Sequence, residues 1–182
     1  MMRKIRLFAI AIFVSVFVVI FSGSNGLAQT VPDRVTAVYS ATARATGVPL
    51  RVPSIIPLNS SAAPSEYWAF SIAPSSDRYS ISFDRAADCT NVNECSFAIA
   101  SGNVRTDTDQ SLASLLDRAD VNGAEAITLD NGAAAVYVPF REGMYAPAYV
   151  YWDIGEYRYT IGLYMASKSD VIAMANSVIA VD

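Results

Sequence analysis

The sequence contains no histidine among its 182 residues. Histidine is the commonest general base and a frequent metal ligand, so its absence excludes a Ser-His-Asp or Cys-His catalytic arrangement within this chain. Lysine is almost as scarce, because beyond the first 28 residues only Lys168 remains, between Ser167 and Ser169. A Ser-Lys hydrolase would need that lysine, but the start of a solvated helix accounts for all three residues.

Motifs for phosphate, metal or carboxylate chemistry are also missing. The chain has no glycine-rich phosphate loop, and the run from Asp117 to Gly123 lacks the spacing and closing glutamate of a calcium loop. Asp107/Asp109 and Asp117/Asp120 are the close acid pairs that a glycosidase would require. Both pairs flank an expected helix, where caps and exposed turns explain them. We therefore expect no catalytic residue, metal or cofactor.

Cysteine occurs twice, as Cys89 and Cys95 around a short polar loop. In an oxidising compartment this arrangement predicts a disulfide. A metal site would need further ligands nearby, and a reactive dithiol more often has the spacing Cys-x-x-Cys.

What the sequence does contain is a typical N-terminal export signal in residues 1–28. Three basic residues and no acid precede an apolar run of about 15 residues, whereas a transmembrane helix needs roughly 20. A short stretch of small and polar residues follows and ends at Gly26-Leu27-Ala28. This pattern predicts cleavage between Ala28 and Gln29. The alternative is an uncleaved N-terminal anchor.

Cleavage would leave one domain, residues 29–182, in the periplasm or the extracellular space. That chain of 154 residues would carry ten basic and seventeen acidic side chains, a net charge of −7. An acidic domain has no electrostatic reason to bind nucleic acid or anionic lipid. We expect neither partner, and no stable membrane span after cleavage.

Apolar periodicity predicts three helices. The first covers residues 33–46 and is capped by Asp33, and the second covers residues 108–119 and is capped by Asp107. The third begins at a capping box of Ser167 and Asp170 and keeps its apolar face through Ile179. Three prolines make residues 48–57 an extended, edge-like segment, and residues 95–100 read as a strand.

Three hairpins follow from alternating hydrophobicity and turn residues. The first pairs residues 67–73 with 78–83 and sets Trp68 opposite Phe83, and the second pairs residues 125–129 with 134–138 and sets Ile127 opposite Val136. The third pairs residues 148–154 with 157–163 around Gly155-Glu156 and sets Trp152 opposite Tyr159. The predicted fold is α+β: an antiparallel sheet of six to seven strands built from hairpins and packed by two or three helices.

Parts of this pattern resemble a bacterial domain of unknown function found in secreted proteins, lipoproteins and anti-sigma-factor-like proteins. The similar segments are Tyr151-Trp-Asp-Ile-Gly-Glu-Tyr-Arg-Tyr-Thr-Ile-Gly162, residues 169–177, and the proline-punctuated residues 48–57. The cysteine pair after a Tyr-Ser-Ile-Ser-Phe strand resembles small exported bacterial proteins of the same layout. The resemblance implies export and a compact α+β module, and it supplies no catalytic residue.

The third hairpin also defines a candidate binding face. It consists of Tyr145, Tyr149, Tyr151, Asp153, Arg158 and Thr160. Tyrosine offers contact area with little loss of entropy, so this face can bind a protein or a glycan. The alternative is that helices or loops cover it, or that tyrosine simply suits half-exposed strands.

The predicted function is an exported, non-catalytic module that binds an unidentified protein or envelope component. A secreted carboxylate-based hydrolase and a structural or inhibitory envelope protein are the alternatives.

Overall fold

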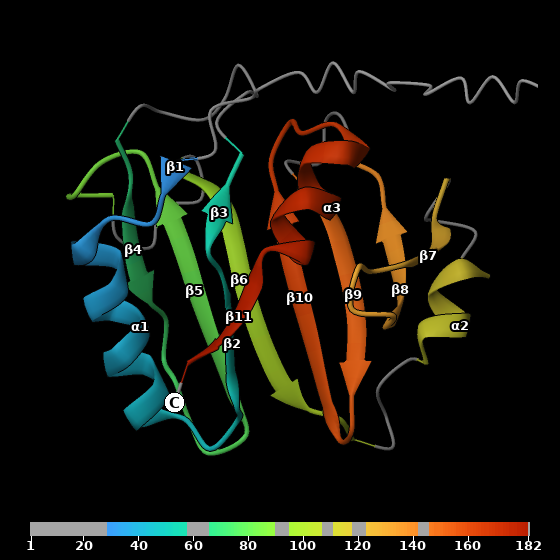
Figure 1. The fold of residues 1–182 in the computed structure, drawn as a ribbon, viewed down its shortest axis with the longest axis horizontal. Helices are drawn as coiled ribbons and strands as arrows, with labels where there is room; N and C mark the ends of the chain where they lie inside the picture. The colour runs from blue at the N-terminus through green and yellow to red at the C-terminus, as the bar shows by residue number, and fades with distance from the viewer. Residues whose placement is uncertain are drawn as a thin grey trace, which may run out of the picture.

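A seven-stranded antiparallel sheet forms the body of the protein, in a computed structural model that describes residues 29–57, 66–89, 95–106, 111–117, 123–141 and 146–181. Figure 1 shows the sheet in its spatial order. From one edge to the other, its strands are β4 (Trp68–Ser71), β5 (Arg78–Asp84), β6 (Ser96–Val104), β10 (Tyr157–Leu163), β9 (Ala148–Ile154), β8 (Ala134–Val138) and β7 (Glu125–Thr128). The predicted α+β class and the predicted antiparallel sheet are confirmed.

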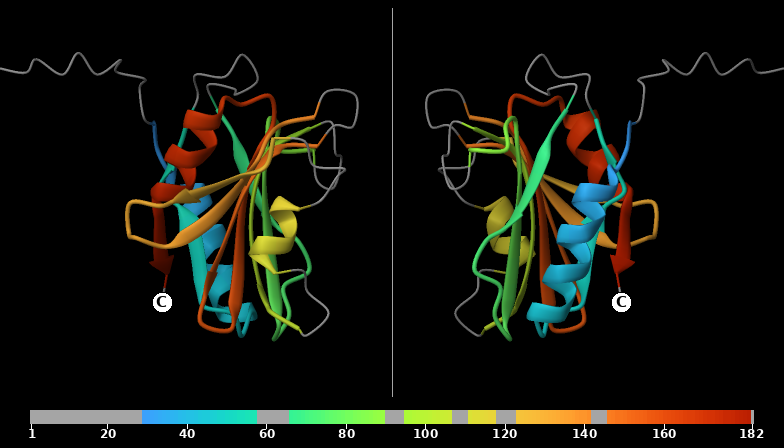
Figure 2. Two further views of the ribbon diagram at one scale, coloured as in Figure 1. Left: turned by 90° about the vertical axis from the view of Figure 1, so that its right-hand side faces the viewer. Right: turned by 90° about the vertical axis from the view of Figure 1, so that its left-hand side faces the viewer.

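A second layer covers one face of this sheet, which we call the inner face. It contains α1 (Asp33–Ala45), α3 (Lys168–Asn176) and two small sheets. One small sheet pairs β1 (Gln29–Thr30) with β3 (Ile55–Ile56), and the other pairs β2 (Leu50–Pro53) with β11 (Val178–Val181). The short helix α2 (Leu112–Leu116) lies on the opposite, outer face, as the edge-on views of Figure 2 show.

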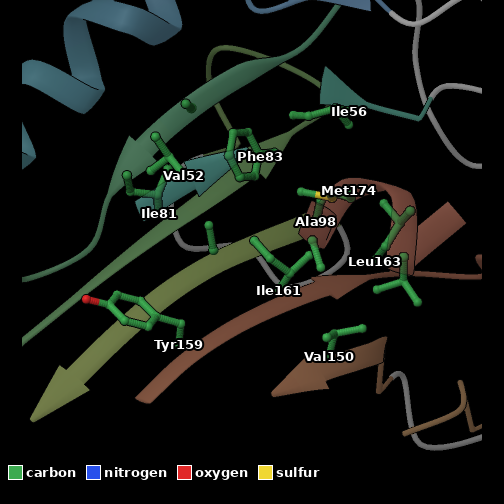
Figure 3. Packing of buried hydrophobic residues seen from close by; sticks show 14 of the residues in the cluster. Val52, Ile56, Ile81, Phe83, Ala98, Val150, Tyr159, Ile161, Leu163 and Met174 are labelled. Atoms are coloured by element: carbon green, nitrogen blue, oxygen red, sulfur yellow. The ribbon is translucent and has the colours of Figure 1, made fainter. Parts of the chain in front are cut away.

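The core lies between the main sheet and the second layer, and small residues on β6 make room for it. Ala98, Ala100 and Gly102 of β6 each sit between large side chains of β5 and β10. Ala100, for example, lies between Ile81 and Ile161, all of them fully buried or nearly so. Strand β2 crosses β6 and brings Val52 onto these side chains (Figure 3). Because β6 carries only small side chains at positions 98, 100 and 102, a strand rather than a helix packs over the middle of the sheet.

Two of the three predicted hairpin registers are wrong by one residue. In the first, Trp68 lies opposite Asp84, and Ala69 lies opposite Phe83. Ala73 adopts a left-handed conformation (φ 39°) and adds a residue beside the Ser75–Arg78 bridge, which shifts the register. The core accordingly buries Tyr67 and Ala69, and Trp68 moves to the outer face.

The second hairpin has a turn one residue shorter than the predicted four-residue connection, residues 130–133. Leu129 donates its amide to the Ala133 carbonyl, which closes a three-residue connection with Gly132 at φ 82°. Ile127 therefore faces Ala135 instead of Val136. The third hairpin has the predicted register throughout, including Trp152 opposite Tyr159.

The helix ends also differ from the predictions. Asp33 is the first helical residue and not the cap, since Pro32 occupies the cap position without a side-chain hydrogen bond. Helix α2 begins at Leu112 under a Ser111 cap, and the predicted cap Asp107 lies outside the described residues.

The predicted cap of the last helix is confirmed, because the Ser167 hydroxyl accepts the Asp170 amide. Its predicted end is wrong: α3 stops at Asn176, and Val178 and Ile179 belong to β11. The Ser177 hydroxyl explains the break, since it accepts the Ile55 amide and so ties the chain to β3. Strand β6 runs past the predicted end at Ala100 to Val104.

Cys89 and Cys95 form the predicted disulfide, with 5.5 Å between their Cα atoms. The bond joins the segment after β5 to the start of β6, where the Arg85 amide donates to the Cys95 carbonyl. Within the described ranges, no helix has the length and apolar character needed to cross a membrane. The predicted cleavage site begins at Ala28, which lies outside those ranges, whereas Gln29 is the first residue of β1.

Candidate functional site

Five of the six predicted face residues share the outer face of the sheet. Tyr149, Tyr151 and Asp153 alternate along β9, and the pairing of β9 with β10 sets Thr160 beside Tyr151 and Arg158 beside Asp153. The sixth, Tyr145, falls outside the described part of the chain.

Helix α2 covers part of this face. Leu115 packs with Val136 and Val138, and the half-buried Tyr149 and Tyr151 border the same cluster. The two tyrosine rings lie 5.5 Å apart, and burial raises the pKa of Tyr149 above its usual range. The alternative that a helix covers this face is therefore correct in part, because the two tyrosines pack against the α2 cluster and are also partly exposed.

Gly162 fixes the position of the Tyr149 ring. A Cβ atom at Gly162 would lie 2.7 Å from the Ile99 Cγ2 methyl and 2.8 Å from a carbon of the Tyr149 ring. The ring therefore lies close to the β10 backbone, in space that any other residue at position 162 would fill.

The charged residues of the face pair with each other. Arg158 donates from Nε and Nη2 to the two carboxylate oxygens of Asp153 at 2.8 and 3.0 Å, and Arg105 contacts the same carboxylate at 3.0 Å. The Arg158 side chain is 11% exposed and that of Asp153 is 19% exposed. This cluster is a largely buried cross-strand link, so it orders the end of the hairpin more than it offers charge to a ligand.

The part of the outer face over β4 and β5 carries surface residues that were not predicted from the sequence. The one-residue shift of the first hairpin places Trp68 and Phe70 there, both half-buried, and Ile72 is 36% exposed. Apolar residues occur at 67 and 69 on one face of the strand and at 68 and 70 on the other, so the sequence pattern alone is compatible with two registers. The deciding signal was the turn, whose extra left-handed residue has no glycine or asparagine to mark it.

A row of hydroxyl side chains crosses the outer face between these two aromatic groups. The register sets Ser80 beside Ser101, Ser101 beside Thr160, and Thr160 beside Tyr151, across four adjacent strands. We call these four residues the hydroxyl row. An open depression of about 460 Å³ lies at its Ser80–Ser101 end, bordered by Arg78 and Asn103. The outer face thus offers neutral hydrogen-bonding groups, aromatic flanks and a shallow recess.

Asp84 is the described carboxyl group with the most unusual surroundings. It is fully buried, its Oδ1 atom accepts the Ser96 hydroxyl at 2.7 Å, and its Oδ2 atom has no hydrogen-bond partner. Burial raises its pKa, although the hydroxyls of Ser96 and Ser82 act in the opposite direction. A glycosidase would need a second acid within reach, and none among the described residues contributes to this shift.

Replacing Asp84 with asparagine should stabilise the protein at neutral pH. Because the folded-state pKa is raised, folding favours the protonated acid, and its contribution is lost as the pH rises through the folded pKa. Asparagine stays neutral and can still accept from Ser96, so we expect a gain of about 1 kcal/mol at pH 7. Urea unfolding at pH 7 and pH 4 should show the gain shrinking at the lower pH. Asp88→Asn, at an exposed acid nearby, is the control. A loss of stability of the Asp84→Asn variant at pH 7 would contradict the prediction that the buried Asp84 carboxylate destabilises the fold.

No group of three or more histidine, cysteine or acidic residues that could hold a metal ion occurs among the described residues. Comparison of the chain with family models, curated proteins and solved structures gave no match. The resemblance of residues 151–162 to exported bacterial domains therefore stays an expectation from the sequence.

Proposed function

We propose that the protein is an exported, non-catalytic module that binds a protein partner of the cell envelope through its outer face. The hydroxyl row carries this proposal. Ser80, Ser101, Thr160 and Tyr151 lie in register on neighbouring strands, with aromatic side chains on both sides. Serine supplies adaptable hydrogen bonds and tyrosine supplies rigid contact area, which is the composition of protein-binding surfaces.

The other observations are consistent with export and with a protein partner. A disulfide is typical of proteins in oxidising compartments, and the N-terminal 28 residues have the pattern of a cleaved signal. The side of the outer face over β4, β5 and β6 carries the half-buried Trp68 and Phe70 and the exposed Ile72. The guanidinium carbon of Arg34 lies 4.8 Å from the centre of the Trp68 ring. Partly exposed apolar groups beside hydrogen-bonding groups favour a docking surface.

Ser101→Lys tests the proposal at the middle of the hydroxyl row. A long charged side chain there should block a docked surface, and we expect capture of the partner from an envelope extract to fall at least about ten-fold. Ser101 borders the open depression, so the fold has room for the lysine. Capture is measured by quantitative mass spectrometry with immobilised protein.

Thr36→Lys is the matched control, because it adds the same charge at an exposed position of α1 in the other layer. It should capture as well as the wild type. Tyr149→Ala is a weaker test, since it also removes packing against the α2 cluster. Equal capture by Ser101→Lys and the wild type would reject the outer face and favour a purely structural or inhibitory role.

A further inference from the structure

A small recess lies on the inner side of the main sheet, away from the hydroxyl row. It is enclosed by β2, β9, the end of α3 and the connection between β7 and β8, and its volume is about 70 Å³. One water molecule needs roughly 10–15 Å³ by this kind of measure, so the recess holds about five waters or a small chemical group. Its polar lining comes from Arg51, Asn131 and Asn176, and Trp152 is among the apolar remainder.

Arg51 is the charged group of this recess, and none of the ion pairs observed among the described residues involves it. Its Nε atom is buried and has no hydrogen-bond partner, and its guanidinium carbon lies 5.7 Å from the centre of the Tyr159 ring. Tyr159 in turn stacks on Trp152. No described carboxylate lies within ion-pairing distance of Arg51. A guanidinium at the wall of a recess without a carboxylate beside it attracts an anion, so an occupant that carries negative charge and accepts hydrogen bonds would be stabilised there.

Two asparagines of the lining can also donate hydrogen bonds. The Asn131 Oδ1 atom accepts the Ala133 amide at 3.0 Å, and the Asn176 Oδ1 atom accepts the Asp130 amide at 3.0 Å. Each side-chain oxygen is thus occupied by the backbone, which leaves each NH₂ group as a donor. The lining contains no acidic side chain. A guanidinium and two amide donors beside an aromatic wall are a suitable environment for a planar anion.

We propose that this recess binds a carboxylate group, held by the Arg51 guanidinium with the side-chain amides of Asn131 and Asn176. The volume admits the carboxylate and a short substituent, so a larger ligand would extend into solvent. The carboxylate can belong to a free small acid or to a peptide. The recess lies on the other side of the sheet from the hydroxyl row, so a test of carboxylate binding does not depend on the proposed function.

Trp152 provides a direct readout, because it lines the recess and the chain has one other tryptophan. In a Trp68→Phe background, titration with sodium acetate and sodium benzoate should change the Trp152 fluorescence saturably, and sodium chloride at equal ionic strength should not. An N-acetylated dipeptide and its amide form the second arm. Tighter binding of the dipeptide acid than of acetate identifies a peptide carboxylate, and equal or weaker binding identifies a small acid.

Arg51→Gln should weaken carboxylate binding at least about ten-fold, because it removes a charged, bidentate donor. Arg51→Lys keeps the charge and most of the stem and should bind with intermediate affinity, which covers the case in which the glutamine variant does not fold. Arg44→Gln, at an exposed arginine of α1, should bind like the wild type. No saturable response to either carboxylate arm, or undiminished binding by a folded Arg51 variant, would overturn the proposal and identify a water-filled recess.

Discussion

Gly102→Ala should lower the free energy of unfolding by about 3 kcal/mol. A Cβ atom at this position would lie 2.5 Å from a ring carbon of Tyr79, on the buried side of the sheet. Tyr79 cannot easily move, because its hydroxyl donates to the Arg51 carbonyl at 2.7 Å and accepts the Arg51 amide at 3.1 Å. The methyl group must therefore strain the ring or break both hydrogen bonds to β2. Urea unfolding followed by circular dichroism measures the loss.

A double-mutant cycle with Tyr79→Leu separates this clash from a general intolerance of alanine in β6. Leucine lacks the ring atoms that meet the new methyl, so Gly102→Ala should cost less than about 1 kcal/mol in that background. Ser101→Ala, one residue away and on the outer face, should be nearly neutral. A cost for Gly102→Ala that is the same in both backgrounds would show that Tyr79 is not the cause.

The third hairpin shows which part of the fold local sequence can predict. Gly155-Glu156 forms the two-residue turn, and the apolar residues of the hairpin alternate on one face only. A slip of one residue would have moved Trp152 to the outer face and Asp153 into the apolar core of the inner face, so turn and pattern selected the same register.

The first two hairpins show the limit of this reasoning. Apolar residues face both ways along β4 and the residue before it, since Tyr67 and Ala69 alternate with Trp68 and Phe70. Here only the turn decides the register, and a left-handed Ala73 has no sequence signal. Likewise, Asn131-Gly132 indicates a turn without determining whether it has three or four residues. A register error of one residue then assigns an aromatic side chain to the core when it lies on the surface. The predicted binding face is incomplete as a result.

The candidate sites depend on pairings that no local pattern contains. The hydroxyl row exists because β10 pairs with β6, which brings Thr160 beside Ser101 from far along the chain. The carboxylate recess requires Arg51 from β2, Asn176 from the end of α3 and Asn131 from a turn. Each residue taken alone reads as an ordinary turn, cap or edge residue. The sequence could indicate the tyrosines of one hairpin, but not the surface that they complete.

Asp153→Leu should destabilise the protein by about 2–4 kcal/mol, a little less than the loss of one partner from a fully buried ion pair. The carboxylate of Asp153 is the shared acceptor of Arg158 and Arg105. Removing it leaves the Arg158 guanidinium, with a side chain that is 11% exposed, without this acceptor. Arg158→Met should cost less, because Asp153 is more exposed and keeps Arg105.

The double variant Asp153→Leu/Arg158→Met decides whether charge or packing causes the loss. Suppose that the cost of Asp153→Leu comes mainly from a largely buried Arg158 guanidinium that has lost the Asp153 carboxylate. In that case, removing Arg158 as well should restore at least half of the lost free energy of unfolding, measured by urea unfolding. Additive losses would instead mean that both side chains act through packing alone. A recovery would show that the two charges are coupled, so that the pair stabilises the end of the third hairpin only when both partners are present.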